Sequence, residues 1–213
     1  MGHPWLALLA IFLALPASAA DGRAEQAAQA GSASPTRLTG RYLLMDANGR
    51  AVSNEDFRGR FQLLSFGYTY CPDVCPTTLA EMASVINRLG KDAERLQALF
   101  VTVDPERDTA SALRAYVEFF DPRIVGLTGS PALVRRAADG FGVRYEIVRE
   151  PGAPADQYAV DHSAGMYLLG PDGRYIRKFA FAMPPTEIAE RIAEMIARIS
   201  YPPGSTRGQP PVE

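Results

Sequence analysis

The feature that most constrains the fold of this chain is a regular alternation of apolar runs and amphipathic segments after residue 60. Phe61 to Tyr68 and Leu99 to Val103 are continuous apolar runs, as expected for strands that are buried on both faces of a sheet. Each run is followed by a segment in which apolar residues recur at helical spacing, and the first of these segments begins at Pro76. Strands that alternate with helices predict an α/β fold, with parallel strands in the sheet and helices on its faces.

The later segments complete this order. A strand is expected at 124–127, a helix after 131 and a locally paired segment at 143–148. Two further strands are expected at 163–169 and 175–181, and a last helix at 185–199. Pro171, Asp172 and Gly173 give a strong turn signal between the last two strands. A terminal antiparallel hairpin followed by a helix is the thioredoxin arrangement. We therefore expect a thioredoxin-like α/β fold, with a central mixed sheet and flanking helices.

A second hairpin is expected before the first buried strand. Arg41 to Met45 and Arg50 to Val52 flank a turn that contains Asn48 and Gly49. Asn-Gly is a favoured pair in short hairpin loops because both residues tolerate a positive φ. This hairpin is an N-terminal addition to the thioredoxin-like order.

The two ends of the chain differ in composition from the segment between them. Trp5 to Leu15 is apolar and precedes a small-residue pattern, so residues 1–20 are predicted to be a signal peptide or an N-terminal membrane anchor. Residues 21–37 are polar and are expected to form a flexible tether, and the Pro- and Gly-rich residues 201–213 are expected to be disordered. The folded domain is then expected at 38–200. The leader predicts that this domain is periplasmic, either soluble or tethered to the inner membrane.

The charge of the chain argues against one broad class of partner. The chain has 22 Lys and Arg against 24 Asp and Glu, which gives a formal net charge of −2. The basic residues are not clustered in the sequence. Because binding to a phosphate backbone requires clustered positive charge, we expect no nucleic-acid partner.

The two cysteines of the chain lie between the first buried strand and the helix that follows it. The sequence from Cys71 to Pro76 is Cys-Pro-Asp-Val-Cys-Pro. A structural disulfide is one interpretation, but so small a loop constrains few residues of the unfolded chain. A thiol at the start of a helix faces free N–H groups and the positive end of the helix dipole, which predicts a lowered pKa. With Pro76 suited to the first helical position, Cys71 and Cys75 are candidates for a redox-active dithiol or for ligands of a soft metal.

His162 is the only histidine outside the leader, and it is expected to begin the first strand of the late hairpin. A packing histidine is one interpretation. The thioredoxin arrangement, however, brings this hairpin next to the cysteine loop. Two thiolates and an imidazole suit copper, as Cu(I) or Cu(II), whereas a structural zinc site requires four ligands. We therefore predict that Cys71, Cys75 and His162 bind one copper ion.

The sequence resembles the Sco/SenC copper-binding proteins, which are used in assembling cytochrome c oxidase. The matching stretches are Gly67-Tyr68-Thr69-Tyr70-Cys71-Pro72-Asp73-Val74-Cys75-Pro76, Val103-Asp104-Pro105-Glu106-Arg107-Asp108-Thr109, and Val160-Asp161-His162-Ser163 with Tyr167-Leu168-Leu169-Gly170-Pro171-Asp172-Gly173. They span about residues 40–198. The resemblance implies a thioredoxin fold, copper carried by Cys71, Cys75 and His162, and delivery of that copper to the two-copper centre of an oxidase subunit. It also implies thiol-disulfide chemistry on the cysteines of that subunit.

Three functions follow from these features. The first is a monomeric copper metallochaperone, which is a binding and transfer protein rather than an enzyme. Its expected partners are the copper-receiving oxidase subunit and another periplasmic copper chaperone or thiol reductant. The second is an extracytoplasmic thiol-disulfide oxidoreductase, which has no need of an imidazole at position 162. The third is a peroxidase, which requires a low-pKa thiolate beside an arginine, and the cysteine loop contains none.

Five other polar or sulfur-containing residues lie in or near these motifs. Asp73 is expected to hydrogen-bond a turn. Asp161 is either a carboxylate that orients the imidazole or a solvated residue at the end of a strand. Met166 shares a strand face with His162 by alternation, and we expect it in the core rather than on the metal. Asp104 and Asp108 are expected to serve the entry and capping of the second helix, for which Thr109 is also a possible cap.

Overall fold

A computed structural model of the protein describes residues 38–200. The leader and tether predicted for residues 1–37 and the tail predicted for residues 201–213 lie outside the described residues. Along the described part the elements are β1 (Leu43–Asp46), β2 (Ala51–Ser53), η1 (Asn54–Phe57), β3 (Phe61–Gly67), α2 (Val74–Leu89), η2 (Gly90–Arg95), β4 (Leu96–Thr102), α3 (Ala110–Phe120), β5 (Ile124–Thr128), α4 (Pro131–Gly140), β6 (Tyr145–Val148), β7 (Ala159–His162), β8 (Met166–Leu169), β9 (Tyr175–Phe179) and α5 (Pro185–Ser200).

Seven of the described strands form one mixed sheet, in the order β2-β1-β5-β4-β3-β8-β9. The strand β3 runs parallel to the central strand β4, and β4 runs parallel to β5. On its other side β3 pairs with β8 in the antiparallel sense. The hairpin β1–β2 joins the far edge through an antiparallel pairing of β1 with β5. The predicted α/β fold, with its central mixed sheet and added N-terminal hairpin, is confirmed.

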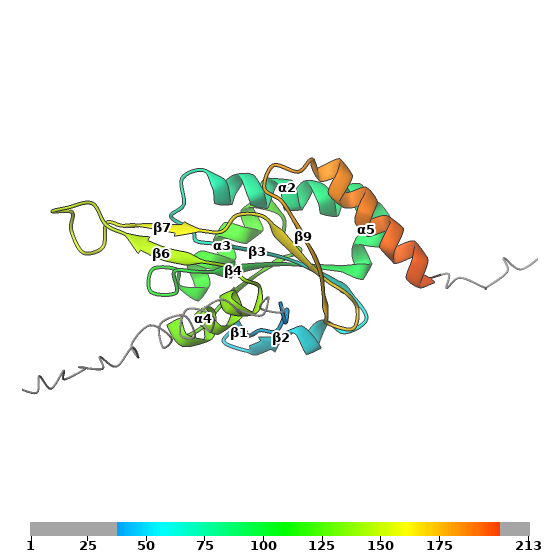
Figure 1. Ribbon diagram of the computed structural model, residues 1–213, viewed down its shortest axis with the longest axis horizontal. Helices are drawn as coiled ribbons and strands as arrows, with labels where there is room; N and C mark the ends of the chain where they lie inside the picture. The colour runs from blue at the N-terminus through cyan, green and yellow to red at the C-terminus, as the bar shows by residue number, and fades with distance from the viewer. Residues whose placement is uncertain (1–37, 201–213) are drawn as a thin grey trace, which may run out of the picture. The chain divides into compact units, whose positions relative to one another are not determined.

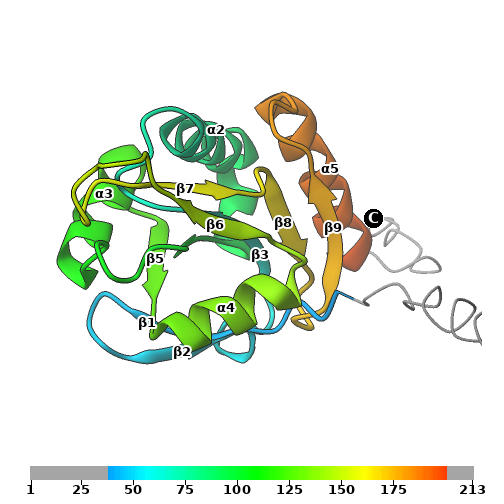
Figure 2. The same cartoon turned by 60° about the vertical axis from the view of Figure 1, so that its left-hand side comes forward.

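Helices cover both faces of this sheet, so its central strands are buried. Figures 1 and 2 show α2 and α5 side by side on one face and α4 on the other. Each of the seven residues of β3 and of β4 is buried. Leu63, Leu64, Leu99 and Phe100 have no measurable exposure at all. Continuous burial on both faces explains why these strands read as unbroken apolar runs rather than as alternating patterns.

The strands β6 and β7 stand apart from the main sheet. They pair with each other in an antiparallel two-stranded sheet, in which Tyr145 lies opposite His162. We call residues 145–162, which comprise these strands and their connecting loop, the arm. Its loop extends from the body of the domain in Figure 1.

The arm corrects the predicted position of His162. His162 was expected to begin the late hairpin, but it ends β7, and the hairpin strand β8 begins only at Met166. The chain turns between the two strands at Gly165, which has a φ of +114°. A Cβ at Gly165 would lie 2.6 Å from the carbonyl oxygen of Phe179. The positive φ and this close approach together favour glycine here, and the strand predicted at 163–169 begins only after this turn.

The start of α2 also differs from the expectation. The helix begins at Val74, so Pro76 is its third residue rather than its first. Proline is still accommodated there because the first four N–H groups of a helix have no intrahelical partner. Cys75 therefore lies inside the first turn, and Cys71 lies in the loop before it.

The described helices also bear on the question of a membrane segment. Among residues 38–200, none of the helices combines the length and the apolar character that are needed to cross a bilayer.

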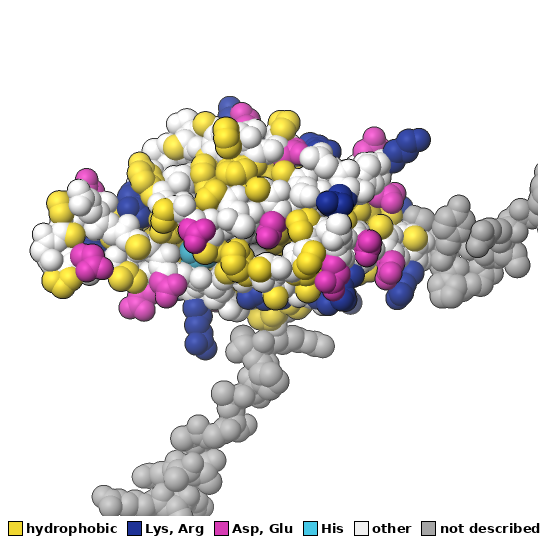
Figure 3. Space-filling model, turned by 90° about the horizontal axis from the view of Figure 1, so that it is seen from above, with side chains coloured by type: hydrophobic (Ala, Val, Ile, Leu, Met, Phe, Trp, Pro, Cys, Tyr) yellow, Lys and Arg dark blue, Asp and Glu magenta, His cyan; other side chains and the backbone are white. Residues whose placement is uncertain are grey.

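Figure 3 shows the face above α2 and α5, where apolar side chains are gathered and acidic and basic ones are interspersed among them.

The N-terminal contacts of the described part generate a prediction about the domain boundary. The N–H groups of Thr39 and Gly40 donate to the carbonyl of Gly140, and the Tyr42 hydroxyl donates to Gln62. A fragment of residues 36–200 keeps these contacts and should unfold in a single cooperative transition. A fragment of residues 43–200 loses the buried Tyr42 ring and should be less stable by about 3 kcal/mol. Denaturant unfolding of both fragments tests this, and equal stability would place the boundary after residue 42.

Candidate metal centre

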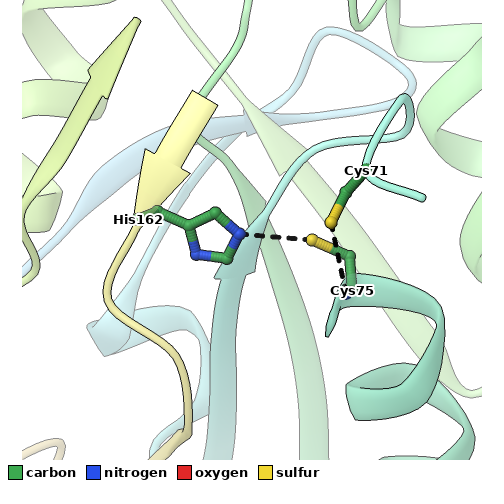
Figure 4. A group of neighbouring side chains, drawn as sticks. All are labelled: Cys71, Cys75 and His162. Atoms are coloured by element: carbon green, nitrogen blue, oxygen red, sulfur yellow. Dashed lines mark hydrogen bonds between the residues drawn. The ribbon is translucent and has the colours of Figure 1, made fainter. Parts of the chain in front are cut away.

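Two segments that are distant in sequence bring Cys71, Cys75 and His162 together. The two cysteines come from the loop after β3 and from the first turn of α2, and the histidine comes from the end of β7. The ligand atoms of the three side chains all lie within 4.8 Å of one another. Figure 4 shows the imidazole pointing at the two sulfur atoms, with Cys75 Sγ 3.3 Å from His162 Nε2. The Cys75 N–H donates to Cys71 Sγ at 3.4 Å.

Gly67 leaves the space that the Cys75 sulfur occupies. This residue ends β3, and its carbonyl accepts a hydrogen bond from the Val103 N–H at 2.8 Å. A Cβ at Gly67 would lie 2.6 Å from Cys75 Sγ and 2.8 Å from the ring of Phe100. Any larger residue would therefore displace the sulfur. The backbone of β3 thus forms the inner wall of the site.

A buried carboxylate fixes the loop that carries Cys71. Asp108 accepts hydrogen bonds from the Thr69 N–H, from the Thr69 hydroxyl at 2.6 Å and from the Thr102 hydroxyl at 2.6 Å. The expected capping role of Asp108 is therefore wrong, because Thr109 caps α3 by accepting from the Ala112 N–H. Burial raises the pKa of Asp108, although the bonds from the two threonines oppose this shift.

The environment of Cys75 opposes the predicted thiol chemistry. Its side chain is 1% exposed, and burial raises the pKa of its thiol well above the ordinary value. The hydrogen bond with Cys71 contributes in the same direction. The expectation of a lowered pKa at the helix start is wrong for this residue because desolvation of the thiolate outweighs the favourable helix dipole. Cys75 is therefore a protonated thiol in the metal-free protein at neutral pH.

The imidazole of His162 is held ready as a neutral ligand. Burial lowers the pKa of His162, and the Ser163 carbonyl and the Asp161 charge offset only part of this shift. Its Nδ1 lies 3.4 Å from the Ser163 carbonyl oxygen, to which an Nδ1–H group can donate. That tautomer leaves the lone pair of Nε2 directed at Cys75.

The structure separates the other candidate residues from this group. Met166 is 2% exposed and belongs to the hydrophobic core, as predicted. Asp161 is exposed, and the hydrogen-bond partner of His162 Nδ1 is the Ser163 carbonyl rather than this carboxylate. Asp73 precedes α2 and, among the described residues, its side chain forms no capping hydrogen bond, contrary to the expectation. The Asp104 carboxylate accepts from Arg107 and from the Tyr158 hydroxyl, and the Asp104 carbonyl accepts from the Asp108 N–H in the turn before α3.

Sequence reasoning missed the arginine that the fold brings beside the cysteine loop. The guanidinium of Arg107 lies 5.0 Å from the ring centre of Tyr70 and 5.7 Å from that of Tyr68, both of which flank the loop. The cysteine loop itself contains no arginine. Arg107 follows the neighbouring strand β4, and only the fold places it beside that loop. The Asp104-Pro-Glu-Arg107 run was the available signal.

Comparison with known proteins adds to this geometry. A family model described as SCO1/SenC matches residues 30–197 of the chain. The mitochondrial protein SCO2 homolog of Danio rerio is 43% identical over 155 residues, which are 72% of this chain and 55% of that protein. The SCO2-like protein of Rickettsia felis is 36% identical over 155 residues, which are 72% of this chain and 75% of that protein. This chain thus matches little more than half the length of the Danio rerio relative.

Two solved structures extend the likeness to three dimensions. Bradyrhizobium japonicum ScoI with copper bound is 38% identical, has a TM-score of 0.67, and is matched over 74% of this chain and 98% of that one. Yeast Sco1 with copper bound is 31% identical, has a TM-score of 0.69, and is matched over 79% of this chain and 92% of that one.

The fold and the site together define a thioredoxin-like protein with a Cys-Cys-His group at the carboxyl end of its central strands. More particularly, the extent of the family match shows that this chain belongs to the SCO1/SenC family.

The contact at Gly67 generates a prediction about the site. Replacing Gly67 with Ala should push the Cys75 sulfur out of its position, because the new methyl group would lie 2.6 Å from it. We expect an overpacking cost of about 1–3 kcal/mol in unfolding free energy, together with weaker copper binding. Gly129→Ala is the matched control, since a Cβ there meets its nearest neighbour at 3.4 Å. Unchanged copper affinity in Gly67→Ala would show that the sulfur position is not critical.

Proposed function

We propose that this protein is a copper metallochaperone, which binds one copper ion through Cys71, Cys75 and His162 and delivers it to the two-copper centre of cytochrome c oxidase. The observation that carries the proposal is the convergence of two sulfur atoms and one imidazole nitrogen within 4.8 Å. Copper as the metal is supported by this ligand set and by the copper-bound Sco structures that the chain resembles at 30–38% identity.

The ligand set also indicates how each oxidation state of copper is held. Cu(I) is satisfied by two thiolates, whereas Cu(II) gains from the imidazole as a third strong donor. Among the described residues this is the one group of three Cys, His, Asp or Glu side chains with metal-ligand spacing. A structural zinc site would require a fourth ligand. Binding must also release the Cys75 proton, because thiolate rather than thiol is the ligand.

Exposure of the loop suggests the side from which a recipient approaches. Cys75 is buried, whereas Cys71 is half-buried and its neighbour Tyr70 is 64% exposed. Phe181 is 41% exposed, and its N–H lies close to Gly165 in the turn that follows His162. Aromatic side chains are favoured at protein interfaces. We infer that the oxidase subunit docks over this rim and that its ligands replace Cys71 first.

Location and partners complete the proposal. The leader at residues 1–20 directs the domain at 38–200 to the periplasm, as a cleaved signal peptide or as an anchor of the inner membrane, with residues 21–37 as the tether. A further periplasmic copper chaperone or thiol reductant supplies the metal or the electrons, and the protein acts as a monomer.

A second candidate function is thiol-disulfide exchange, and the proximity of the two thiols favours it. The Cys71 thiolate would attack one sulfur of a disulfide in the oxidase subunit, and Cys75 would then displace that sulfur. A Cys71–Cys75 disulfide forms, and the partner leaves with two thiols. Cys71 is the attacking group in this scheme because it is half-buried and accessible, whereas Cys75 is 1% exposed.

Oxidation of the two cysteines should abolish copper binding. A disulfide between Cys71 and Cys75 removes both thiolate donors, so the oxidised protein should keep no stoichiometric copper. Titration of the oxidised and the reduced protein with Cu(I) measures this, and treatment with a thiol reductant should restore one site. Retention of one copper per oxidised chain would contradict the proposed ligands.

Replacing His162 with Ala should weaken Cu(II) more than Cu(I). The variant keeps both thiolates and loses one of three donors, so we expect Cu(II) affinity to fall at least about tenfold and Cu(I) affinity to change little. The measurements are the thiolate-to-Cu(II) absorption and competition for Cu(I). Asp161→Ala is the matched control, since this residue is exposed on the same strand. If His162→Ala keeps the affinity for both ions, the histidine is a packing residue and the oxidoreductase function is favoured.

A further inference from the structure

The position of His162 depends on how the arm is attached to the domain. The arm forms its own two-stranded sheet, so the main sheet does not fix it through strand pairing. The imidazole must nevertheless stay within 3.3 Å of Cys75, which belongs to α2. Side-chain contacts must therefore provide the attachment.

One cluster of side chains supplies contacts of this kind. We call it the Arg107 cluster, and it consists of Tyr68, Tyr70, Asp104, Arg107 and Tyr158. The Arg107 guanidinium lies 3.5 Å from the ring centre of Tyr158 and donates through Nη1 to the Tyr158 carbonyl at 2.9 Å. The Tyr158 hydroxyl in turn donates to Asp104 at 2.9 Å, and Asp104 forms an ion pair with Arg107. Arg107 thus contacts the side chain and the backbone of the same residue of the arm.

The other side of the cluster belongs to the cysteine loop. Tyr68 and Tyr70 lie around the same guanidinium, and Tyr68 also contacts the arm directly. The Val160 N–H donates to the Tyr68 hydroxyl at 3.2 Å. The rings of Tyr68 and His162 pack edge to face, with their centroids 6.1 Å apart and an angle of 85° between their planes. A continuous set of contacts therefore runs from the cysteine loop through Arg107 to the strand that ends at His162.

The charges of the cluster indicate that the planar geometry of the Arg107 guanidinium matters more than its positive charge. Its side chain is 16% exposed, and its charge is balanced by Asp104, which is 3% exposed. Arg107 Nη2 is buried and has no hydrogen-bond partner among the residues that the structure describes. An unsatisfied buried donor is costly, and stacking against aromatic rings is an interaction that a planar guanidinium provides and an ammonium does not.

We propose that Arg107 is a positioning residue, which holds His162 against the cysteine pair by joining the arm to the cysteine loop. The proposal rests on the copper-binding function inferred above, but the attachment of the arm can be tested without metal. It predicts that the flat, forked guanidinium is required and that positive charge alone is insufficient.

The test compares Arg107→Lys with a matched control, Arg149→Lys. Arg149 also stacks on Tyr158, at 4.9 Å, but it is exposed and belongs to the arm, so it cannot join the arm to the domain. In the metal-free protein, exchange of the Val160 amide hydrogen reports the bond to Tyr68. We expect Arg107→Lys to accelerate this exchange at least about tenfold and Arg149→Lys to leave it within about twofold, because Arg107 joins the arm to the domain and Arg149 does not. Unchanged exchange in Arg107→Lys overturns the proposal.

Copper binding gives a second, independent readout. Arg107→Lys should weaken Cu(II) at least about tenfold while Cu(I), held by the two thiolates, changes less than about threefold. In a His162→Ala background the same substitution should cause no further loss, because Arg107 acts through the imidazole. An equal loss in both backgrounds, or equal losses for the two ions, overturns the proposal.

A milder variant covers the case in which Arg107→Lys does not fold. Tyr158→Phe keeps the ring under the guanidinium and removes only the hydroxyl that donates to Asp104. It should give smaller changes in the same direction in both measurements, and no change in either overturns the proposal. Failure of the copper function is recognised separately, since wild-type protein would then bind no copper while the Val160 exchange still reports the arm.

Discussion

The geometry of the metal centre depends on the buried carboxylate of Asp108. This carboxylate accepts hydrogen bonds from three groups, which belong to two threonines. Thr69 begins the cysteine loop, and Thr102 ends β4. The carboxylate therefore fixes the loop relative to the parallel pair β3–β4, in which Gly67 lies opposite Thr102. Gly67 also limits how closely the Cys75 sulfur can approach the sheet. The same few residues therefore position both thiols. Hydrogen bonds thus continue the rigid sheet into the site.

Much of the fold follows from the sequence because the central strands are buried on both faces. Such strands must be continuous apolar runs, and β3 and β4 could be recognised on that ground. The Asn48-Gly49 pair likewise predicted the β1–β2 hairpin, because glycine tolerates the positive φ of such turns. In the structure Gly49 has a φ of +76°. Cys71, Cys75 and His162 could be selected because so few residues of these types exist in the chain.

The remaining features depend on tertiary contacts that local patterns do not encode. Nothing in the residues around His162 shows that it ends a strand of a separate sheet, because that pairing involves residues 145–148, which lie well before it in the chain. The direction of the Cys75 pKa shift depends on burial by the assembled core, whereas the helix position alone suggests the opposite direction. The proposed role of Arg107 arises only when β4 is placed beside β3 and the arm contacts the residues that follow these strands.

The unequal environments of the two cysteines also bear on how such a site can both hold and release a metal. Burial disfavours an isolated thiolate at Cys75, so its deprotonation is coupled to the arrival of a cation that compensates the charge. Cys71 is half-buried and lies in a loop beside the exposed ring of Tyr70, so an incoming ligand reaches it first. If Cys71 is displaced, the metal retains one buried thiolate and the imidazole, and loss of the next bond is favoured by reprotonation of Cys75. On the proposed function, the raised pKa of the Cys75 thiol would make release easier than from two stable thiolates, and the imidazole of His162 would hold the metal until the exchange begins.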